Sequence, residues 1–156
     1  MDAWQTEMLQ HTHEYVQNQI TLGDAKAAGI LAWDAALVAW LAEMLSPQPS
    51  FGVLLGMLLA TGGLLILSVV FSAFALMPRT PSASPENRVS FVDIACRRAD
   101  YYRKQMMGGS EADCCEDLCE HIHVLGGIAA AKFGHVRVAV ILSAMASGLL
   151  ILSLLM

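Results

Sequence analysis

The feature that most constrains this chain is an apolar segment from Phe51 to Met77 that contains no charged residue. An α-helix needs about 20 residues to cross the roughly 30 Å of hydrocarbon in a bilayer. The segment exceeds that length, so it can span a bilayer with some tilt. Pro78 and Arg79 follow it directly and end it. The sequence therefore predicts an integral membrane protein.

Two further apolar segments predict membrane spans. Residues 138–156 form a second uncharged block, at the C-terminus. Residues 27–45 form a weaker block, with Asp34 in its middle and Glu43 near its end. A central aspartate costs about 2.5–3.5 kcal/mol on insertion scales, and the surrounding apolar side chains offset that cost. We therefore predict an all-α membrane fold with three transmembrane helices, at 27–45, 51–77 and 138–156.

The composition agrees with this class and excludes others. Hydrophobic residues make up 56% of the chain and charged residues 15%, whereas soluble domains carry about 25% charged residues. The net charge of −5 gives no electrostatic reason to bind a nucleic acid polymer. A soluble enzyme, a DNA-binding domain and a disulfide-stapled secreted module are excluded. The sequence shows no nucleophile–base set and no phosphate or dinucleotide motif, so we expect neither enzymatic activity nor a cofactor.

The placement of basic residues predicts the topology. All nine lysines and arginines lie in residues 1–26 and 78–137, and none lies in the short proline-containing turn at 46–50. Loops rich in Lys and Arg stay in the cytoplasm. We therefore expect a cytoplasmic N-terminus, a cytoplasmic 78–137 region and a periplasmic C-terminus.

The N-terminal segment, residues 1–26, is predicted to be a cytoplasmic helix. Trp4, Met8, His11 and Tyr15 recur at helical spacing and form one stripe. Thr21 to Asp24 predicts a break or bend, with Asp24 capping the first membrane helix.

The second cytoplasmic part consists of a linker at 78–90 and a helical region at 91–137. One helix is predicted from Phe91 to Met107, ended by Gly108 and Gly109. Ser110 then caps the next helix together with Asp113. We expect this helix to continue into the third span.

Several polar residues are candidates for function. Asp34 lies inside a span, where ionisable residues face the bundle interior; it is either a hydrogen-bonded aspartate packed between helices or a pore-lining group. Cys115, Cys119 and His123 share a helix face and carry zinc-binding atoms, but their spacing matches no standard site. We favour packed, reduced thiols there and expect no bound metal.

Small residues predict self-association of the spans. Gly52, Gly56 and Ala60 follow one face of the second span, and Ala144 and Gly148 follow one face of the third. Such faces let helix backbones approach closely in lipid, although Gly and Ala are common in all membrane helices. A homo-oligomer within the lipid bilayer is expected.

Five short motifs follow one another along the chain in a defined order. They are Gly23-Asp24-Ala25-Lys26-Ala27-Ala28, Ser90-Phe91-Val92-Asp93-Ile94, Tyr101-Tyr102, His121-Ile122-His123-Val124-Leu125 and Ile128-Ala129-Ala130-Ala131-Lys132-Phe133. Their order relative to the spans resembles that in the small transmembrane effectors of Pycsar antiphage systems, over about residues 10–150. His121 stands where the family pattern has glutamine.

The resemblance implies an abortive-infection effector in the bacterial inner membrane. A neighbouring cyclase makes cyclic CMP or cyclic UMP on infection, and the nucleotide activates the effector, which damages the membrane. A cyclic nucleotide needs a cation for its phosphate and an aromatic or amide-like group for its base. The candidate ligand residues are Asp24, Lys26, Arg98, Tyr102 and Lys132.

Each candidate residue has a structural alternative. Asp24 and Lys132 are equally explained as an ion pair that ties two spans together, and the basic cluster around Arg98 as pairs within one helix. Two alternatives to a gated effector stay open for the whole chain. One is a membrane anchor or assembly subunit that needs no ligand, and the other is a holin-like channel.

Overall fold

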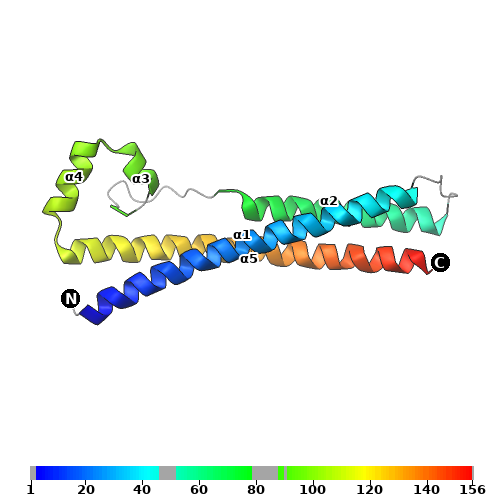
Figure 1. Cartoon of the computed structure of the whole chain (residues 1–156), viewed down its shortest axis with the longest axis horizontal. Coiled ribbons are helices and arrows are strands. Elements are labelled where there is room, and N and C mark those ends of the chain that lie inside the picture. The colour runs from blue at the N-terminus through cyan, green and yellow to red at the C-terminus, as the bar shows by residue number, and fades with distance from the viewer. Residues whose placement is uncertain (1–2, 46–51, 79–87, 90, 156) are drawn as a thin grey trace. The chain divides into compact units, whose positions relative to one another are not determined.

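The computed structural model describes residues 3–45, 52–78, 88–89 and 91–155, and its regular structure there is entirely helical (Figure 1). The helices are α1 (Ala3–Leu45), α2 (Val53–Leu76), α3 (Phe91–Cys96), α4 (Ala99–Gly108) and α5 (Glu111–Leu154). Three of them, α1, α2 and α5, are long and apolar enough to cross a membrane. The all-α fold with three spans is confirmed.

The predicted break between Thr21 and Asp24 is wrong, because α1 runs through it without interruption. A glycine inside a helix costs only about 1 kcal/mol relative to alanine. Here Gly23 packs close to α5, since a Cβ on it would lie 3.8 Å from the Cβ of Lys132. Asp24 is consequently not a helix cap and lies in the interior of α1.

The predicted single helix from Phe91 to Met107 is also wrong, because it divides into α3 and α4 at Arg97 and Arg98. Arg98 has an extended backbone and precedes the first turn of α4. The Arg97 guanidinium donates a hydrogen bond of 2.8 Å to the Gln105 side chain, which holds the turn against α4.

The predicted end of this helix at Gly108 and the predicted start of the next helix after Ser110 are confirmed. α4 ends at Gly108, and α5 begins after Ser110 and continues to Leu154. The Ser110 hydroxyl accepts a hydrogen bond from the Asp113 N–H, and the Asp113 carboxylate accepts one from the Ser110 N–H. This is the reciprocal arrangement of a capping box.

Two of the predicted boundaries of the membrane spans do not coincide with the end of a helix. The limits at 26/27 and 137/138 fall inside the continuous helices α1 and α5, so where the membrane begins along them stays a prediction. The turn at 46–50 and most of the linker at 78–90 lie outside the described residues.

The chain divides into two compact units, which are considered separately. The bundle unit comprises Leu22–Met77 and Ala131–Met156, and the polar unit comprises Met1–Thr21 and Pro78–Ala130. The first contains the C-terminal part of α1, α2 and the C-terminal part of α5. The second contains α3, α4 and the N-terminal parts of α1 and α5.

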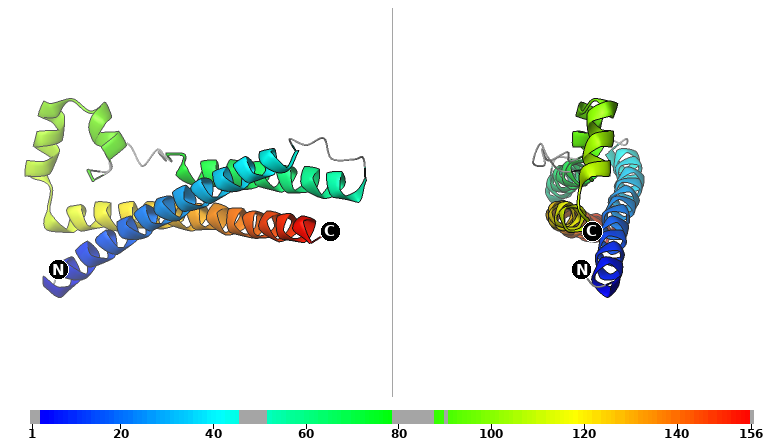
Figure 2. Two further views of the ribbon diagram at one scale, coloured as in Figure 1. Left: turned by 45° about the vertical axis from the view of Figure 1, so that its right-hand side comes forward. Right: turned by 90° about the vertical axis from the view of Figure 1, so that its left-hand side faces the viewer.

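Within the bundle unit the contacts define the helix directions. Asp24 pairs with Lys132 and Asp34 with Ser143, so α1 and α5 run parallel. Ser68 contacts Asp34, and Ala75 packs with Ala27, so α2 runs antiparallel to both. The three helices lie side by side in Figure 2.

The bundle unit is more polar inside than a soluble core. Its fully buried side chains include Leu58, Leu65 and Leu150, but also Asp34, Thr61, Ser68 and Ser72. Its outward face carries large apolar side chains, among them Trp33, Leu59 and Ile66, each more than half exposed. Exposed apolar surface on this scale fits a lipid environment rather than water.

Candidate functional site

The centre of the bundle unit is a carboxyl group held by the two other helices. Asp34 of α1 is fully buried. Its Oδ2 accepts a hydrogen bond of 2.6 Å from the Ser68 hydroxyl of α2, and its Oδ1 accepts one of 2.6 Å from the Ser143 hydroxyl of α5. The Ser68 oxygen also lies 3.1 Å from the Ala139 carbonyl oxygen. We call Asp34, Ser68 and Ser143 the Asp34 cluster.

The Asp34 cluster agrees with one of the two interpretations drawn from the sequence. The carboxyl group is hydrogen-bonded and enclosed between helices, as a buried polar group must be to avoid its desolvation cost. In this arrangement it does not line an open channel, and pore lining by Asp34 requires the three helices to separate.

The ion pair that the sequence allowed is present in the bundle unit. The Lys132 ammonium of α5 donates a hydrogen bond to Oδ1 of Asp24 on α1. The Lys132 side chain is only 6% exposed, against 39% for Asp24. Lys26 is exposed and lies over the Phe133 ring, 5.2 Å from its centroid. Three of the five candidate ligand residues thus gather at one end of the bundle unit.

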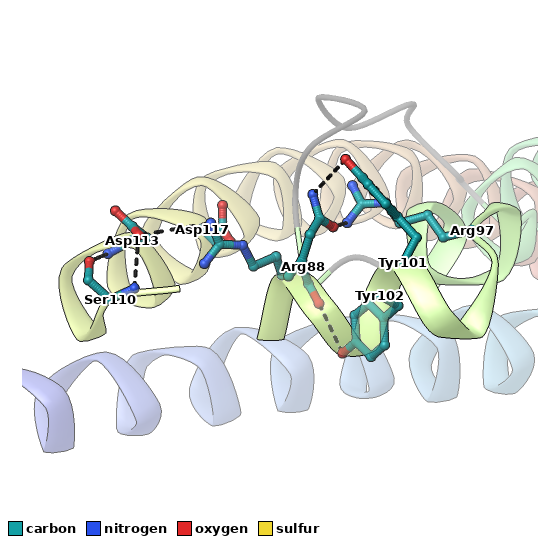
Figure 3. Close-up of polar contacts among 8 residues, drawn as sticks. Arg88, Arg97, Tyr101, Tyr102, Ser110, Asp113 and Asp117 are labelled. Atoms are coloured by element: carbon teal, nitrogen blue, oxygen red, sulfur yellow. Dashed lines mark hydrogen bonds and ion pairs between the residues drawn. The ribbon is translucent and has the colours of Figure 1, made fainter. Parts of the chain in front are cut away.

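The other two candidates belong to the polar unit. Arg98 is exposed at the start of α4, and its side chain forms no described cap hydrogen bond. The Tyr102 hydroxyl donates a hydrogen bond of 3.3 Å to the Arg88 carbonyl (Figure 3). Within this unit, therefore, Tyr102 supports the backbone at Arg88.

Arg88 is the organising residue of the polar unit, and the sequence did not reveal it. Its Nε lies 3.3 Å from Asp117 and its Nη2 lies 4.0 Å from Asp113, both on α5 (Figure 3). The guanidinium also packs on Gly109, where a Cβ would lie 2.1 Å from Nη1. A single arginine thereby joins the end of the linker, the α4–α5 turn and α5.

The ionised form of Asp113, in the first turn of α5, is stabilised by its neighbours. Hydrogen bonds from the Ser110 backbone and then from its hydroxyl lower the pKa of Asp113 below its ordinary value, and the Arg88 charge adds to this effect. A carboxylate in the first turn also suits the positive end of the helix dipole.

The cysteine and histidine cluster does not form a metal centre in the described part of the chain, where no three His, Cys, Asp or Glu side chains come together as ligands. Burial raises the pKa of the Cys115 thiol, and Glu111 adds to it. A thiol of this kind stays protonated near neutral pH, whereas metals bind the thiolate. Cys119 and His123 are exposed on α5.

Ser68 and Ser143, the two serines of the Asp34 cluster, were also not identified from the sequence. Hydroxyls are frequent in membrane helices, and nothing in their spacing shows which one meets an aspartate 34 or 109 residues away. A usable signal is that Asp34 must find donors on other spans, and Ser68 and Ser143 lie at matching depths in their predicted spans.

Three apolar helices with a polar interior define an α-helical integral membrane protein. The model of a family described as the Pycsar effector protein domain matches residues 8–156, so the chain belongs to this family. Membership makes it an antiphage effector in a cyclic pyrimidine nucleotide signalling context. No curated protein and no solved structure gave a match.

Proposed function

We propose that this chain is an inner-membrane effector that cyclic CMP or cyclic UMP switches from a closed bundle to an arrangement that impairs the membrane. It acts without catalysis, as part of abortive infection. The N-terminus and the polar unit face the cytoplasm, and the C-terminus faces the periplasm. The proposal follows from family membership together with the positive-inside pattern.

The main support for the proposed switch is the pairing of α1 with α5. Their parallel contact depends on two polar links, Asp24–Lys132 at one end and Asp34–Ser143 further along. Removing a partner from a buried polar link costs much more than the link itself contributes. A bundle joined in this way has a defined closed state that a competing ligand can weaken.

A cyclic nucleotide has the chemistry to compete at the first link. Its phosphate carries one negative charge, as the Asp24 carboxylate does, and can replace that carboxylate as the partner of Lys132. Lys26 adds a second cation on the same end of the bundle unit. Arg98 and Tyr102 belong to the polar unit, where a guanidinium and an aromatic ring stay separate candidates for binding the nucleotide.

The nucleotide acts by shifting a population. A change from 1:99 to 99:1 requires about 10⁴-fold tighter binding to the open state. Only contacts that differ between the two states contribute to this ratio. The Asp24–Lys132 pair is such a contact, because it is made in the closed state and lost when the phosphate takes its place.

Self-association belongs to the proposal. The small-residue faces are exposed rather than packed within the chain, both at Gly52, Gly56 and Ala60 and at Ala144 and Gly148. In the polar unit, Trp4, Met8 and Tyr15 form an exposed apolar stripe, each about 60% exposed. These surfaces support contacts between copies of the chain.

Nucleotide dependence is tested in bacteria that carry a membrane-potential dye. The chain is co-expressed with a pyrimidine nucleotide cyclase, either active or catalytically dead. Depolarisation with the active cyclase alone supports the proposal. Depolarisation with both identifies a holin-like channel, and none with either, at equal membrane levels, identifies an anchor or assembly subunit.

A variant links the result to the site. Lys132→Gln is expected to abolish nucleotide-dependent depolarisation, while Lys104→Gln, a change at an exposed lysine of the polar unit, is expected to retain it. Membrane fractions show whether both variants accumulate. The neutral pair Asp24→Asn with Lys132→Gln separates loss of the nucleotide site from misfolding, because it leaves no buried charge unpaired.

A further inference from the structure

The bundle unit has an open groove between α1 and α5, whose lining shares Lys26 with the proposed nucleotide contacts and Ala144 with the proposed self-association face. Its volume is about 410 Å³. Gly29 and Trp33 line it on α1, and Val136, Val140 and Ser147 line it on α5. Lys26 stands at one end as its only charged lining residue among those described. The groove is therefore apolar along its length and cationic at one end.

The length of the groove matches one leaflet of a bilayer. On α5 its lining runs from Val136 to Ser147, which at 1.5 Å per residue is about 16 Å. Half of the hydrocarbon core is about 15 Å. Lys26 directly precedes the predicted span that begins at residue 27, and this prediction places it at the level of the phospholipid headgroups.

The polar groups in the groove wall are already satisfied by the protein. Trp33 Nε1 donates to the Ser147 hydroxyl at 3.3 Å, and that hydroxyl donates to the Ser143 carbonyl at 2.8 Å. The Ser143 hydroxyl in turn donates to Asp34. The wall consequently needs no water, and hydrocarbon can cover it without leaving a polar atom unpaired.

We propose that this groove binds one acyl chain of an anionic phospholipid in the resting state, with the lipid phosphate at Lys26. The ammonium supplies the charge complementarity, and the one-leaflet length supplies the fit for the chain. The bound lipid lies against Ser143, so it supports the serine that holds Asp34 from the α5 side. The lipid shares Lys26 with the proposed nucleotide contacts but occupies the groove in the absence of nucleotide, so the site goes beyond the proposed gating.

Trp33 allows the proposal to be tested directly. The full chain carrying Trp4→Phe and Trp40→Phe keeps Trp33 as its single tryptophan. It is reconstituted without nucleotide into phosphatidylcholine vesicles that contain increasing fractions of a lipid brominated on its acyl chain. Bromine quenches tryptophan fluorescence on contact, and Trp33 is 57% exposed at the groove. Brominated phosphatidylglycerol is compared with brominated phosphatidylcholine.

We expect phosphatidylglycerol to be preferred about fivefold, the effect of one lysine at an anionic headgroup. Lys26→Gln is expected to bring the two lipids within twofold of each other, while Lys104→Gln keeps the preference. Gly29→Leu fills the groove, since a Cβ there meets open space, and is expected to abolish the preference. Gly63→Leu on α2, also open and outside the groove, is its matched control.

Three results would overturn the proposal. The first is equal quenching by both lipids in the parent, and the second is a preference that survives Gly29→Leu. The third is quenching that falls for both lipids alike as protein density rises, together with disulfide cross-linking of Gly29→Cys between chains. That pair of observations would place a second copy of the chain in the groove.

Discussion

The Ser143 hydroxyl of α5 donates a hydrogen bond of 2.6 Å to Asp34 of α1, across 109 residues of sequence. It is one of two such bonds, and the other comes from Ser68 of α2. All three apolar helices therefore meet at one carboxyl group. Because a buried carboxyl without partners is costly, the stability of the bundle should depend on the donors more than on the acid itself.

Removal of the two donors is the first prediction. Ser68→Ala combined with Ser143→Ala leaves Asp34 buried without hydroxyl partners and should lower the unfolding free energy in detergent micelles by about 1–3 kcal/mol. Adding Asp34→Leu to this pair should restore most of the loss, because an apolar group then replaces the bare carboxyl. Chemical unfolding followed by circular dichroism measures both.

The matched control for the serines lies one turn further along α2. Ser72 is fully buried, and its hydroxyl has no hydrogen-bond partner among the residues that the structure describes. Ser72→Ala should therefore be neutral or slightly stabilising. If adding Asp34→Leu does not make the Ser68→Ala, Ser143→Ala variant more stable, the two hydroxyls contribute by packing alone.

The second prediction concerns the threshold for activation. Asp24→Asn removes the charged partner of the buried Lys132 ammonium and leaves that site free for a phosphate. Less cyclase expression should then be needed for depolarisation. Glu43→Gln, at an exposed acid of the same helix, should leave the threshold unchanged. An unchanged threshold in Asp24→Asn would mean that the nucleotide does not compete with this carboxylate.

The third prediction compares two adjacent glycines. Gly109→Ala places a methyl group 2.1 Å from Arg88 Nη1 and 3.2 Å from the Gln105 carbonyl, so the guanidinium must shift, and this should weaken its contact with Asp117. Gly108→Ala meets open space and should be neutral. Hydrogen exchange of peptides covering residues 105–117 should rise in the first variant only. Equal hydrogen exchange in the two variants would mean that the contacts of Arg88 do not organise the polar unit.

The fourth prediction is a pH dependence at the start of α5. The pKa of Asp113 is lowered in the folded chain, so its contribution to stability is complete above the ordinary carboxyl pKa of about 3.9 and is lost as the pH falls through the lowered value. Ser110→Ala should move this titration upward, toward the ordinary value. Arg88→Gln should move it less, because its charge is the weaker cause. Carboxyl carbon shifts in an NMR titration report both.

The sequence predicted what depends on local pattern. Two long uncharged blocks and a weaker block that contains Asp34 and Glu43 predicted the spans. Ser110 with Asp113 predicted the start of α5, and the matching positions of Asp24 and Lys132 before their spans allowed their pairing. The break at Arg97 was missed because it depends on a side-chain contact with Gln105 in the next helix. Arg88 and the two serines were missed because their partners follow from helix register, which no single segment encodes.

The buried face of α2 carries a spare hydroxyl, and this has a consequence for movement. Ser68 and Ser72 are four residues apart, so a slide of α2 by one turn, about 6 Å, brings Ser72 to the position that Ser68 holds beside Asp34. The carboxyl group keeps a donor from α2 at both ends of that travel. The spacing of the two serines thus defines the step by which α2 could move along the bundle without leaving Asp34 short of a hydroxyl donor, and between the two positions the carboxyl would have no donor from α2.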